Sequence, residues 1–320
     1  MFIGMDKMER VLITGAAGFI GSQLMNRLRN RGLDVIGLDN FNSHLYDPKL
    51  KRDRVKNFDL NVYNCDLRDD IKLEGLLRDF RPDTIVHLAA MAGVRDSLGK
   101  EKSYHANNID ATQNLIDICK KHLPDVRIIY ASTSCVYAGS PVPWVEGKET
   151  GKQLNAYGYT KWANECQMQS SGLNTTGLRF FTVYGPWGRP DMALFDFTKN
   201  ILAGNEITVY NYGDMKRDFT YVDDINDGIE IVLDNDIPSG EIFNIGRGEQ
   251  VALMDFISEI EKNTGKDADK NLAPKHPADT KETWSDTSKL AQYGYSPKVS
   301  IAEGVERFYE WYKEYNGVDA

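Results

Sequence analysis

A run of nine residues near the start of the chain constrains its fold more than any other feature. The stretch "ITGAAGFIG", residues 13–21, continues the apolar run "VLI" and places glycines at Gly15, Gly18 and Gly21. An amphipathic helical pattern follows it, and Asp39 closes the next apolar run, "VIGLD". Glycines with this spacing between a strand and a helix, with an acid at the end of the second strand, are typical of a dinucleotide-binding βαβ unit.

Each position in this unit has an expected task. Gly15 permits the tight turn, Gly18 lets the backbone approach a pyrophosphate, and Gly21 lets the helix pack closely against the strand. The first residues of the helix, Phe19 and Ile20, bring free backbone N–H groups to the same place. Because these donors lie at the positive end of the helix dipole, we expect them to bind the phosphates.

Asp39 predicts which dinucleotide binds. Its carboxylate can accept hydrogen bonds from both hydroxyls of the adenosine ribose, with Asn40 beside it. Its charge opposes a 2′-phosphate by about 1 to 4 kcal/mol per unit charge at about 4 Å. The sequence therefore predicts NAD rather than NADP.

Apolar, β-rich runs alternate with helical patterns through the first half of the chain. We expect strands at 10–14, 34–39, 61–65, 83–89, 126–132 and 175–181, and helices at 19–31, 71–80, 101–122 and 155–171. This alternation predicts the α/β class, with a doubly wound parallel Rossmann sheet. From about residue 186 the pattern loosens towards a last helix near 301–316. We expect residues 1–185 to form the NAD-binding domain with the catalytic residues, and 186–320 a smaller mixed α/β substrate lobe, with contributions crossing the boundary.

Composition narrows the partners. The chain has 320 residues and a formal net charge of −9, which argues against nucleic acid or an anionic membrane as the main partner, because both attract basic surfaces. No apolar run approaches the roughly 20 residues of a membrane span, and the first residues lack an apolar signal segment, so a cytoplasmic protein is expected. The four cysteines stand apart with no CxxC pair, so no metal site is expected.

Two further stretches carry chemistry. "YASTSCVYAG", residues 130–139, ends a predicted strand with hydroxyls, and "NAYGYTKWANE", residues 155–165, places Tyr157 and Lys161 four residues apart, on one helix face. A tyrosine base must lower its pKa of about 10 by about 2 to 3 units to act near neutral pH. The lysine ammonium and the positive nicotinamide ring of NAD⁺ have the right sign. Tyr159 is the weaker candidate, because Ala163 lies four residues after it.

Together these motifs resemble the extended short-chain dehydrogenase/reductase family over nearly the whole chain. The resemblance implies a catalytic set of a strand-end hydroxyl, a tyrosine and a lysine. It also implies that the segments "CDLRD" and "VHLAAMAGVRDS" line the cofactor, and that Asn108 is structural. The positions implied are Thr133, Tyr157 and Lys161 for catalysis, and Asp66, Leu67, Leu88, Ala89 and Ala90, with Tyr157 and Lys161, for the cofactor.

The residues after the strand-end threonine bear on the reaction. Family members that dehydrate nucleotide sugars have an Asp-Glu pair there, whereas this chain has Ser134 and Cys135. Without that carboxylate pair, epimerisation is favoured. Tyr157 would take the proton of the C4 hydroxyl while NAD⁺ takes the hydride, and the 4-keto sugar would turn over before the hydride returns.

Residues 176–224 resemble UDP-glucuronate 4-epimerases. The resemblance implies a UDP-sugar substrate, with the diphosphate at Arg217 and the uridine at the "ITVYN" strand. Thr182 stands where epimerases of neutral hexoses usually have asparagine, and with Arg189 it is expected to bind a C6 carboxylate. The candidate substrate-binding residues are Arg95, Ser134, Thr182, Arg189, Val209, Tyr210 and Arg217.

Several positions depart from the family pattern and leave alternatives open. The chain has "VYAG" for VYG, Tyr159 in place of a small residue, and Asp96 where an aromatic residue is common. A UDP-glucose/UDP-galactose 4-epimerase remains the alternative substrate assignment, and a catalytically silent NAD-sensing protein the alternative of another class. The family resemblance also implies a homodimer formed through the helices at 101–122 and 155–171.

Overall fold

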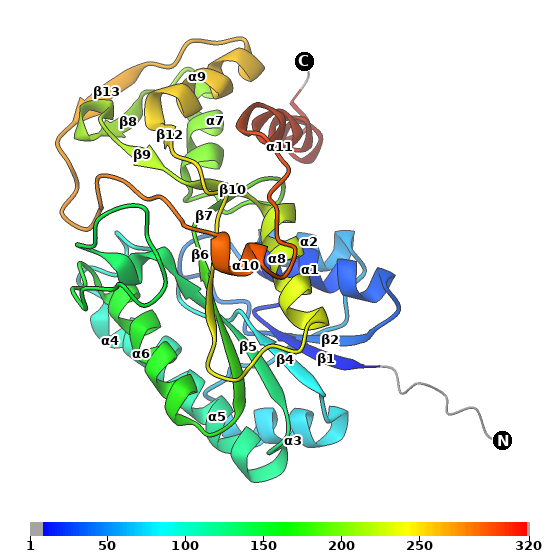
Figure 1. Ribbon diagram of the computed structural model, residues 1–320. Helices are drawn as coiled ribbons and strands as arrows, with labels where there is room; N and C mark the ends of the chain where they lie inside the picture. Colours follow the sequence, from blue (N-terminus) through cyan, green and yellow to red (C-terminus); the bar gives the residue numbers. More distant parts are fainter. Residues whose placement is uncertain (1–8, 319–320) are drawn as a thin grey trace.

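The computed structural model describes residues 9–318, and a seven-stranded parallel sheet forms its centre (Figure 1). The strands lie in the order β11-β6-β5-β4-β1-β2-β3. Their bounds are β1 Arg10–Thr14, β2 Asp34–Asp39, β3 Val62–Asn64, β4 Thr84–His87, β5 Arg127–Thr133, β6 Asn174–Phe180 and β11 Ile242–Ile245. The chain order reverses between β1 and β4, which is where ligands bind in doubly wound sheets. The predicted fold class is confirmed.

Helices cover both faces of this sheet, which is why its strands are apolar on both sides. One core joins β1 to α1 and α8, and another joins the opposite face to α3, α5 and α6. The helices of these layers are α1 Phe19–Asn30, α2 Lys49–Asn57, α3 Asp70–Phe80, α4 Glu101–Tyr104, α5 Ala111–His122, α6 Ala156–Ser170 and α8 Val222–Asp234.

The helix expected over 101–122 is interrupted by a π-helical segment, His105–Asp110, between α4 and α5. Asn108 lies in this segment with its side chain buried. Its amide accepts a hydrogen bond from the backbone N–H of Met91 at 2.7 Å and donates to the Met91 carbonyl and the Thr160 hydroxyl, both at 3.0 Å. The wider turn thus lets Asn108 join the strand-4 exit to α6.

The rest of the chain forms a lobe with its own apolar core, drawn above the sheet in Figure 1. Stacked Phe219 and Phe256 lie near its centre. Its elements are β7 Thr182–Tyr184, α7 Ala193–Ala203, β8 Ile207–Tyr210, β9 Lys216–Arg217, β10 Phe219–Tyr221, β12 Val251–Ala252, α9 Leu253–Thr264, β13 Lys270–Ala273 and α11 Ile301–Asn316. The short helix α10 Ser288–Ala291 packs instead against β11 of the central sheet. Short 3-10 turns lie at Ser134–Tyr137 and Asn211–Gly213.

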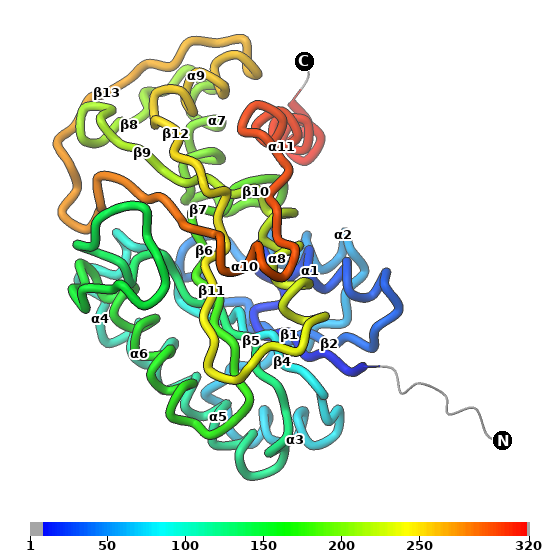
Figure 2. The backbone as a smooth tube through the Cα atoms, in the orientation of Figure 1, coloured from blue at the N-terminus to red at the C-terminus, as the bar shows by residue number. Residues whose placement is uncertain are grey.

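The chain does not stay in this lobe once it has entered it. After β10 it returns to the sheet, where α8 packs beside α1 and β11 pairs in parallel with β6, as the tube in Figure 2 shows. The domain boundary at residue 185 stays a prediction, and α8 and β11 are contributions that cross it.

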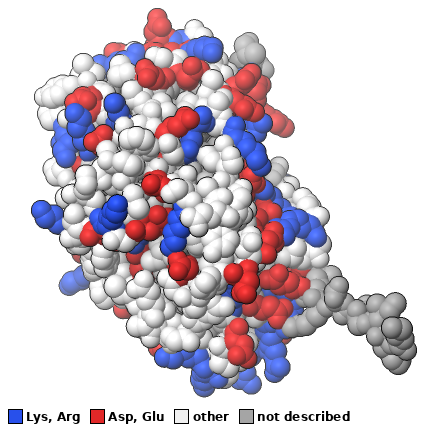
Figure 3. Space-filling view, in the orientation of Figure 1, with Lys and Arg blue, Asp and Glu red and all other residues white. Residues whose placement is uncertain are grey.

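The surface carries both signs of charge. On the face shown in Figure 3, Lys and Arg side chains are interspersed with Asp and Glu. Within residues 9–318, no helix is long and apolar enough to cross a bilayer, and no group of three or more His, Cys, Asp or Glu side chains could hold a metal ion.

Candidate active site

One pocket at the carboxyl edge of the sheet brings together segments far apart in the sequence. The glycine loop, the ends of β2, β4 and β5, the start of α6 and the turn after β7 all line it. Every predicted cofactor residue lies there: Gly15, Gly18, Phe19, Ile20, Gly21, Asp39, Asn40, Asp66, Leu67, Leu88, Ala89, Ala90, Tyr157 and Lys161. Thr133, Ser134, Thr182 and Arg189 line the same pocket.

The glycine loop has the shape that a pyrophosphate requires. Gly15 has φ +71°, in the left-handed region, and a Cβ there would lie 2.8 Å from the Ala89 backbone nitrogen. A Cβ at Gly21 would lie 2.4 Å from the Gly15 carbonyl. Among the described residues, no side chain caps α1 at Gly18 and no acid occupies its first turn. The helix start is therefore open to a phosphate, and these residues fit NAD.

The adenosine end of the pocket contains a charge pair. Asp39 is buried, accepts hydrogen bonds from the backbone N–H groups of Ala17 and Phe41, and lies 3.3 Å from the Lys51 ammonium. Lys51, on α2, partly balances the charge that is expected to oppose a 2′-phosphate. Nearby, Arg68 and Asn40 both donate to Asp66, and the Arg68 bond chiefly lowers the Asp66 pKa.

The three candidate catalytic residues meet at the end of β5. Burial raises the pKa of Tyr157 to about 12, and the nearby Thr133 side chain acts to lower it. Burial lowers the pKa of Lys161 to about 8, although Glu165, one turn further along α6, acts to raise it. Without NAD⁺, burial outweighs the attractive charges around the phenol, so the lowering expected from Lys161 together with the nicotinamide ring stays a prediction.

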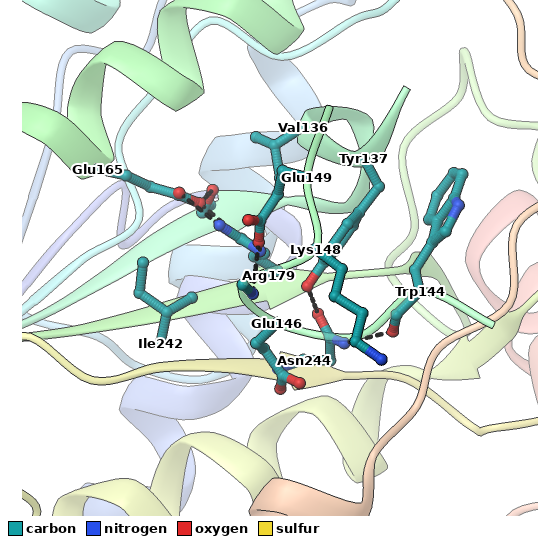
Figure 4. A network of polar contacts seen from close by, with 12 residues as sticks. Val136, Tyr137, Trp144, Glu146, Lys148, Glu149, Glu165, Arg179, Ile242 and Asn244 are labelled. Carbon is teal, nitrogen blue, oxygen red and sulfur yellow. Dashed lines mark hydrogen bonds and ion pairs between the residues drawn. The ribbon is translucent and has the colours of Figure 1, made fainter. Parts of the chain in front are cut away.

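A buried polar network, drawn in Figure 4, includes Glu165 of α6 and Arg179 of β6. Arg179, on β6, forms ion pairs with Glu165 and Glu149, and its guanidinium lies 4.7 Å from the centre of the Tyr137 ring. Glu165 also accepts a hydrogen bond from Ser132, the residue before Thr133. The network therefore fixes α6, which carries Tyr157 and Lys161, against the strand that carries Thr133.

The two residues expected to bind a sugar carboxylate line the pocket with Tyr157. Thr182 begins β7, and its backbone N–H donates to the Asp218 carbonyl at 3.1 Å. Arg189 is held by Asp191, with Nε 3.0 Å and Nη2 2.5 Å from its carboxylate oxygens. The Arg189 charge acts to lower the Tyr157 pKa, so the two side chains interact electrostatically. Among residues 9–318, Arg189 Nη1 has no hydrogen-bond partner and can donate to a ligand.

The residues expected at the nucleotide lie outside this pocket. Arg95 packs over the Tyr210 ring, 4.0 Å from its centre, and forms an ion pair with Asp279 at 2.8 Å. Arg217 donates to the carbonyls of Thr280 and Lys281. Arg95, Tyr210 and Arg217 thus gather around the segment that contains Asp279.

Val209, by contrast, is fully buried in the core of the lobe. Side chains alternate along a strand, so Val209 and its neighbour Tyr210 point in opposite directions and cannot both face a ligand. The side chain of Val209 is therefore packed in the core, and a contact of this residue with the substrate stays a prediction that its backbone would have to fulfil.

Sequence analysis missed several residues of the site. His44 and Lys51 line the pocket, and Arg54 lies fully buried behind it. Asp279 pairs with Arg95 from a distant loop. The missed helix α2 contains only two apolar residues, Leu50 and Val55, among nine, so it offered no amphipathic pattern. Lys51 and Arg54 are three residues apart, which places both side chains on one face of a helix, and this spacing was the signal that the sequence offered.

The open glycine loop, the acid at the end of β2 and the Thr-Tyr-Lys cluster on a doubly wound sheet define an enzyme of the short-chain dehydrogenase/reductase type. Within that class, the chain belongs to the NAD-dependent epimerase/dehydratase family, whose family model matches residues 11–246. The protein is thus an NAD-dependent epimerase.

Characterised relatives span nearly the whole chain. UDP-glucuronate 4-epimerase 4 of Arabidopsis thaliana is 40% identical, with 97% of this chain and 76% of the relative covered. The crystal structure of UDP-glucuronic acid 4-epimerase from Bacillus cereus, with UDP-glucuronic acid and NAD, is 37% identical with a TM-score of 0.88, covering 96% and 99% of the two chains. UDP-glucose 4-epimerase of Thermus thermophilus, with NAD, is 29% identical with a TM-score of 0.85, covering 95% and 99%.

Proposed function

We propose that this enzyme interconverts UDP-glucuronate and UDP-galacturonate by inverting C4 of the sugar. One observation carries the proposal: Thr182 and Arg189 line the same pocket as Tyr157, and the Arg189 charge acts on that phenol. A hydroxyl and a guanidinium at this place suit a carboxylate on the carbon next to the sugar ring. The similarity to UDP-glucuronate 4-epimerases supports the same substrate.

Each residue of the cluster has a defined task in this reaction. Tyr157 takes the proton of the C4 hydroxyl and returns it at the end, while the Thr133 hydroxyl binds the same substrate oxygen. NAD⁺ held by the glycine loop and Asp39 would supply hydride transfer at C4 and a positive charge that favours the tyrosinate. Lys161 holds the nicotinamide ribose. Lys161 is buried and Tyr157 is partly buried, which limits the access of water to the proton transfer.

The carboxylate also has to be restrained. Oxidation at C4 gives a β-keto acid, which loses CO₂ when the bond from the ring to the carboxylate aligns with the carbonyl π system. We propose that Thr182 and Arg189 hold that bond near the ring plane. A charge-assisted hydrogen bond contributes roughly 1.5 to 3 kcal/mol, so its loss shifts the rotamer population by about 10- to 150-fold.

The test follows the sugar by NMR and mass spectrometry. UDP-glucuronate with the wild-type enzyme is expected to give UDP-galacturonate, and the absence of that product contradicts the proposal. Thr182→Ala and Arg189→Ala are expected to yield a decarboxylated 4-keto pentose as well. Thr208→Ala, an exposed threonine on β8, is the matched control and is expected to behave as wild type.

A UDP-glucose/UDP-galactose 4-epimerase is the second candidate, and the similarity to the Thermus thermophilus enzyme favours it. Turnover of UDP-glucose and UDP-glucuronate by the same preparation separates the two. A higher kcat/KM for the neutral sugar would establish the alternative substrate.

A further inference from the structure

We propose that Arg54 is a positioning residue for Arg189, and that it thereby sets the preference of this enzyme for an acidic sugar. The inference rests on the proposed function, because it concerns how Arg189, which is proposed to bind the sugar carboxylate, is positioned. Arg54 lies on α2, outside every motif that the sequence analysis identified, and its side chain does not line the pocket.

Arg54 is fully buried, and all five of its N–H donors have a partner. Nε and Nη2 donate to the Trp187 carbonyl at 3.1 and 2.7 Å, and Nη2 also donates to the Gly188 carbonyl at 3.3 Å. The residue after Gly188 is Arg189. Three of the five hydrogen bonds therefore fix the backbone immediately before the guanidinium that faces the substrate pocket.

The backbone at this turn is one that a bulky residue rarely adopts. Trp187 has φ +62°, in the left-handed region where side chains other than glycine are strained. Its ring packs between Phe58, which follows α2, and Trp311 of α11, at centroid distances of 5.8 and 5.2 Å. Arg54 binds the Trp187 carbonyl, and the two rings fix the Trp187 side chain. The backbone conformation of the turn is therefore fixed by several contacts, and Arg189 is positioned before the substrate binds.

The remaining two donors reach the other side of the pocket. Nη1 donates to the Ala17 carbonyl in the glycine loop at 3.2 Å and to the Tyr46 hydroxyl at 2.9 Å. Tyr46 lines the pocket, and although burial acts to lower the Arg189 pKa, Asp191 chiefly raises it and Tyr46 adds to that effect. A single guanidinium thus joins the cofactor loop, the segment after β2 and the substrate turn.

A lysine at position 54 cannot form this set of hydrogen bonds. An ammonium has three donors on one nitrogen, whereas the acceptors of Arg54 lie on three separate segments and are reached by a planar fork. The variant Arg54→Lys therefore keeps the charge but releases the turn. Arg54→Met removes both charge and donors, and Arg52→Met, the same change at an exposed position of the same helix, is the matched control.

The experiment measures the affinity of the NAD-loaded protein for UDP-glucuronate, UDP-glucose and UDP by calorimetry. We expect Arg54→Met and Arg54→Lys to weaken UDP-glucuronate binding about tenfold or more, which is the loss of one charge-assisted contact. Binding of UDP-glucose and UDP is expected to change less than about twofold, and Arg52→Met is expected to bind all three as wild type does. Decarboxylated product is expected from both Arg54 variants.

The outcomes separate the inference from the proposed function. If the wild-type protein binds UDP-glucose as tightly as UDP-glucuronate, the proposed function fails whatever Arg54 does. If the wild type prefers the uronate and the Arg54 variants weaken all three ligands equally, Arg54 has only a structural role and the inference is overturned. Unchanged preference in folded Arg54→Lys overturns it as well. Where Arg54→Met does not fold, Arg54→Gln takes its place beside Arg54→Lys.

Discussion

Tyr157 and Lys161 lie four residues apart, and burial shifts their pKa values in opposite directions. It raises the Tyr157 pKa to about 12 and lowers the Lys161 pKa to about 8. Both shifts favour the neutral side chains, as expected where charge is poorly solvated. These shifts favour a protonated phenol in the chain without NAD, and we propose that the base forms when the positive nicotinamide ring lies beside it.

The first prediction concerns Tyr157→Phe. The variant lacks the phenolic oxygen, and we expect kcat for epimerisation to fall by about 10²- to 10⁴-fold, with NAD still bound. Tyr159→Phe is the matched control, because Tyr159 is exposed on the same helix, and it is expected to retain wild-type kcat. Unchanged turnover in Tyr157→Phe would refute this role, whereas a wild type that turns over no UDP-sugar would favour a catalytically silent NAD-sensing protein.

A second buried group predicts an acid effect on stability. His87 is enclosed in β4 with its ring nitrogens 2.8 Å from the Thr14 hydroxyl and 3.1 Å from that of Thr112, and burial lowers its pKa to about 3. Below about pH 6.5 the unfolded chain binds a proton there that the folded chain does not. The free energy of unfolding therefore falls as the pH falls from about 6.5 towards 3.

This loss amounts to about 2 kcal/mol between pH 7.5 and pH 5 for one such histidine. Urea unfolding of wild type and His87→Gln at the two pH values measures it, and the variant is expected to lose about 2 kcal/mol less than wild type over the interval. Equal losses in the two proteins would show that His87 is not the group responsible.

Individual residues were predictable where a motif fixes both residue type and place. The glycine loop and the Tyr157–Lys161 pair follow from local spacing, so the sequence was enough to bring them into one pocket. Lys51 and Arg54 were not predictable in this way. Their partners, Asp39 and the Trp187 carbonyl, lie on other segments, and only the folded chain brings those groups together.

At the scale of elements, the first two strands match their predicted bounds, because each is a short apolar run bounded by polar residues. The helix α2 was missed since charge dominates it. It folds here because two of its cations find buried partners, a tertiary effect that no local pattern reveals. The π-helical segment was missed for a similar reason, as it depends on the contact between Asn108 and Met91.

The ion pairs that join α6 to β6 predict a large stability effect. Arg179 and Glu165 are both about one-twentieth exposed, so Arg179→Met leaves a buried carboxylate without its counter-ion. We expect the free energy of unfolding to fall by about 3 to 5 kcal/mol, and Arg179→Met combined with Glu165→Gln to cost less than Arg179→Met alone. Urea unfolding measures both.

Arg307→Met provides the control for that cycle. Arg307 pairs with Glu303 on α11, where both side chains are more than two-fifths exposed, and its loss is expected to cost less than about 1 kcal/mol. If Arg179→Met is no more damaging than Arg307→Met, the network of Figure 4 does not hold the catalytic helix in place.

At the scale of the whole molecule, the helices at 101–122 and 156–170 predict the assembly. The family resemblance implies a homodimer through them, and Tyr159 on α6 exposes more than a third of its surface. Light scattering is expected to give about twice the chain mass of 36.2 kDa. Tyr159→Glu, which places charge in the expected interface, is expected to give single chains, and a wild-type monomer at working concentration would contradict the assembly.

The return of the chain from the lobe to the sheet has a consequence for the order of synthesis. The strand β6 ends at Phe180, but its neighbour β11 begins at Ile242. A ribosome adding about 5 to 20 residues per second needs several seconds to make the intervening segment. During that interval the outer edge of β6 exposes unpaired backbone groups, which attract other strands. The nascent chain is therefore most exposed to aggregation after its nucleotide-binding motif is complete and before its last sheet strand has emerged.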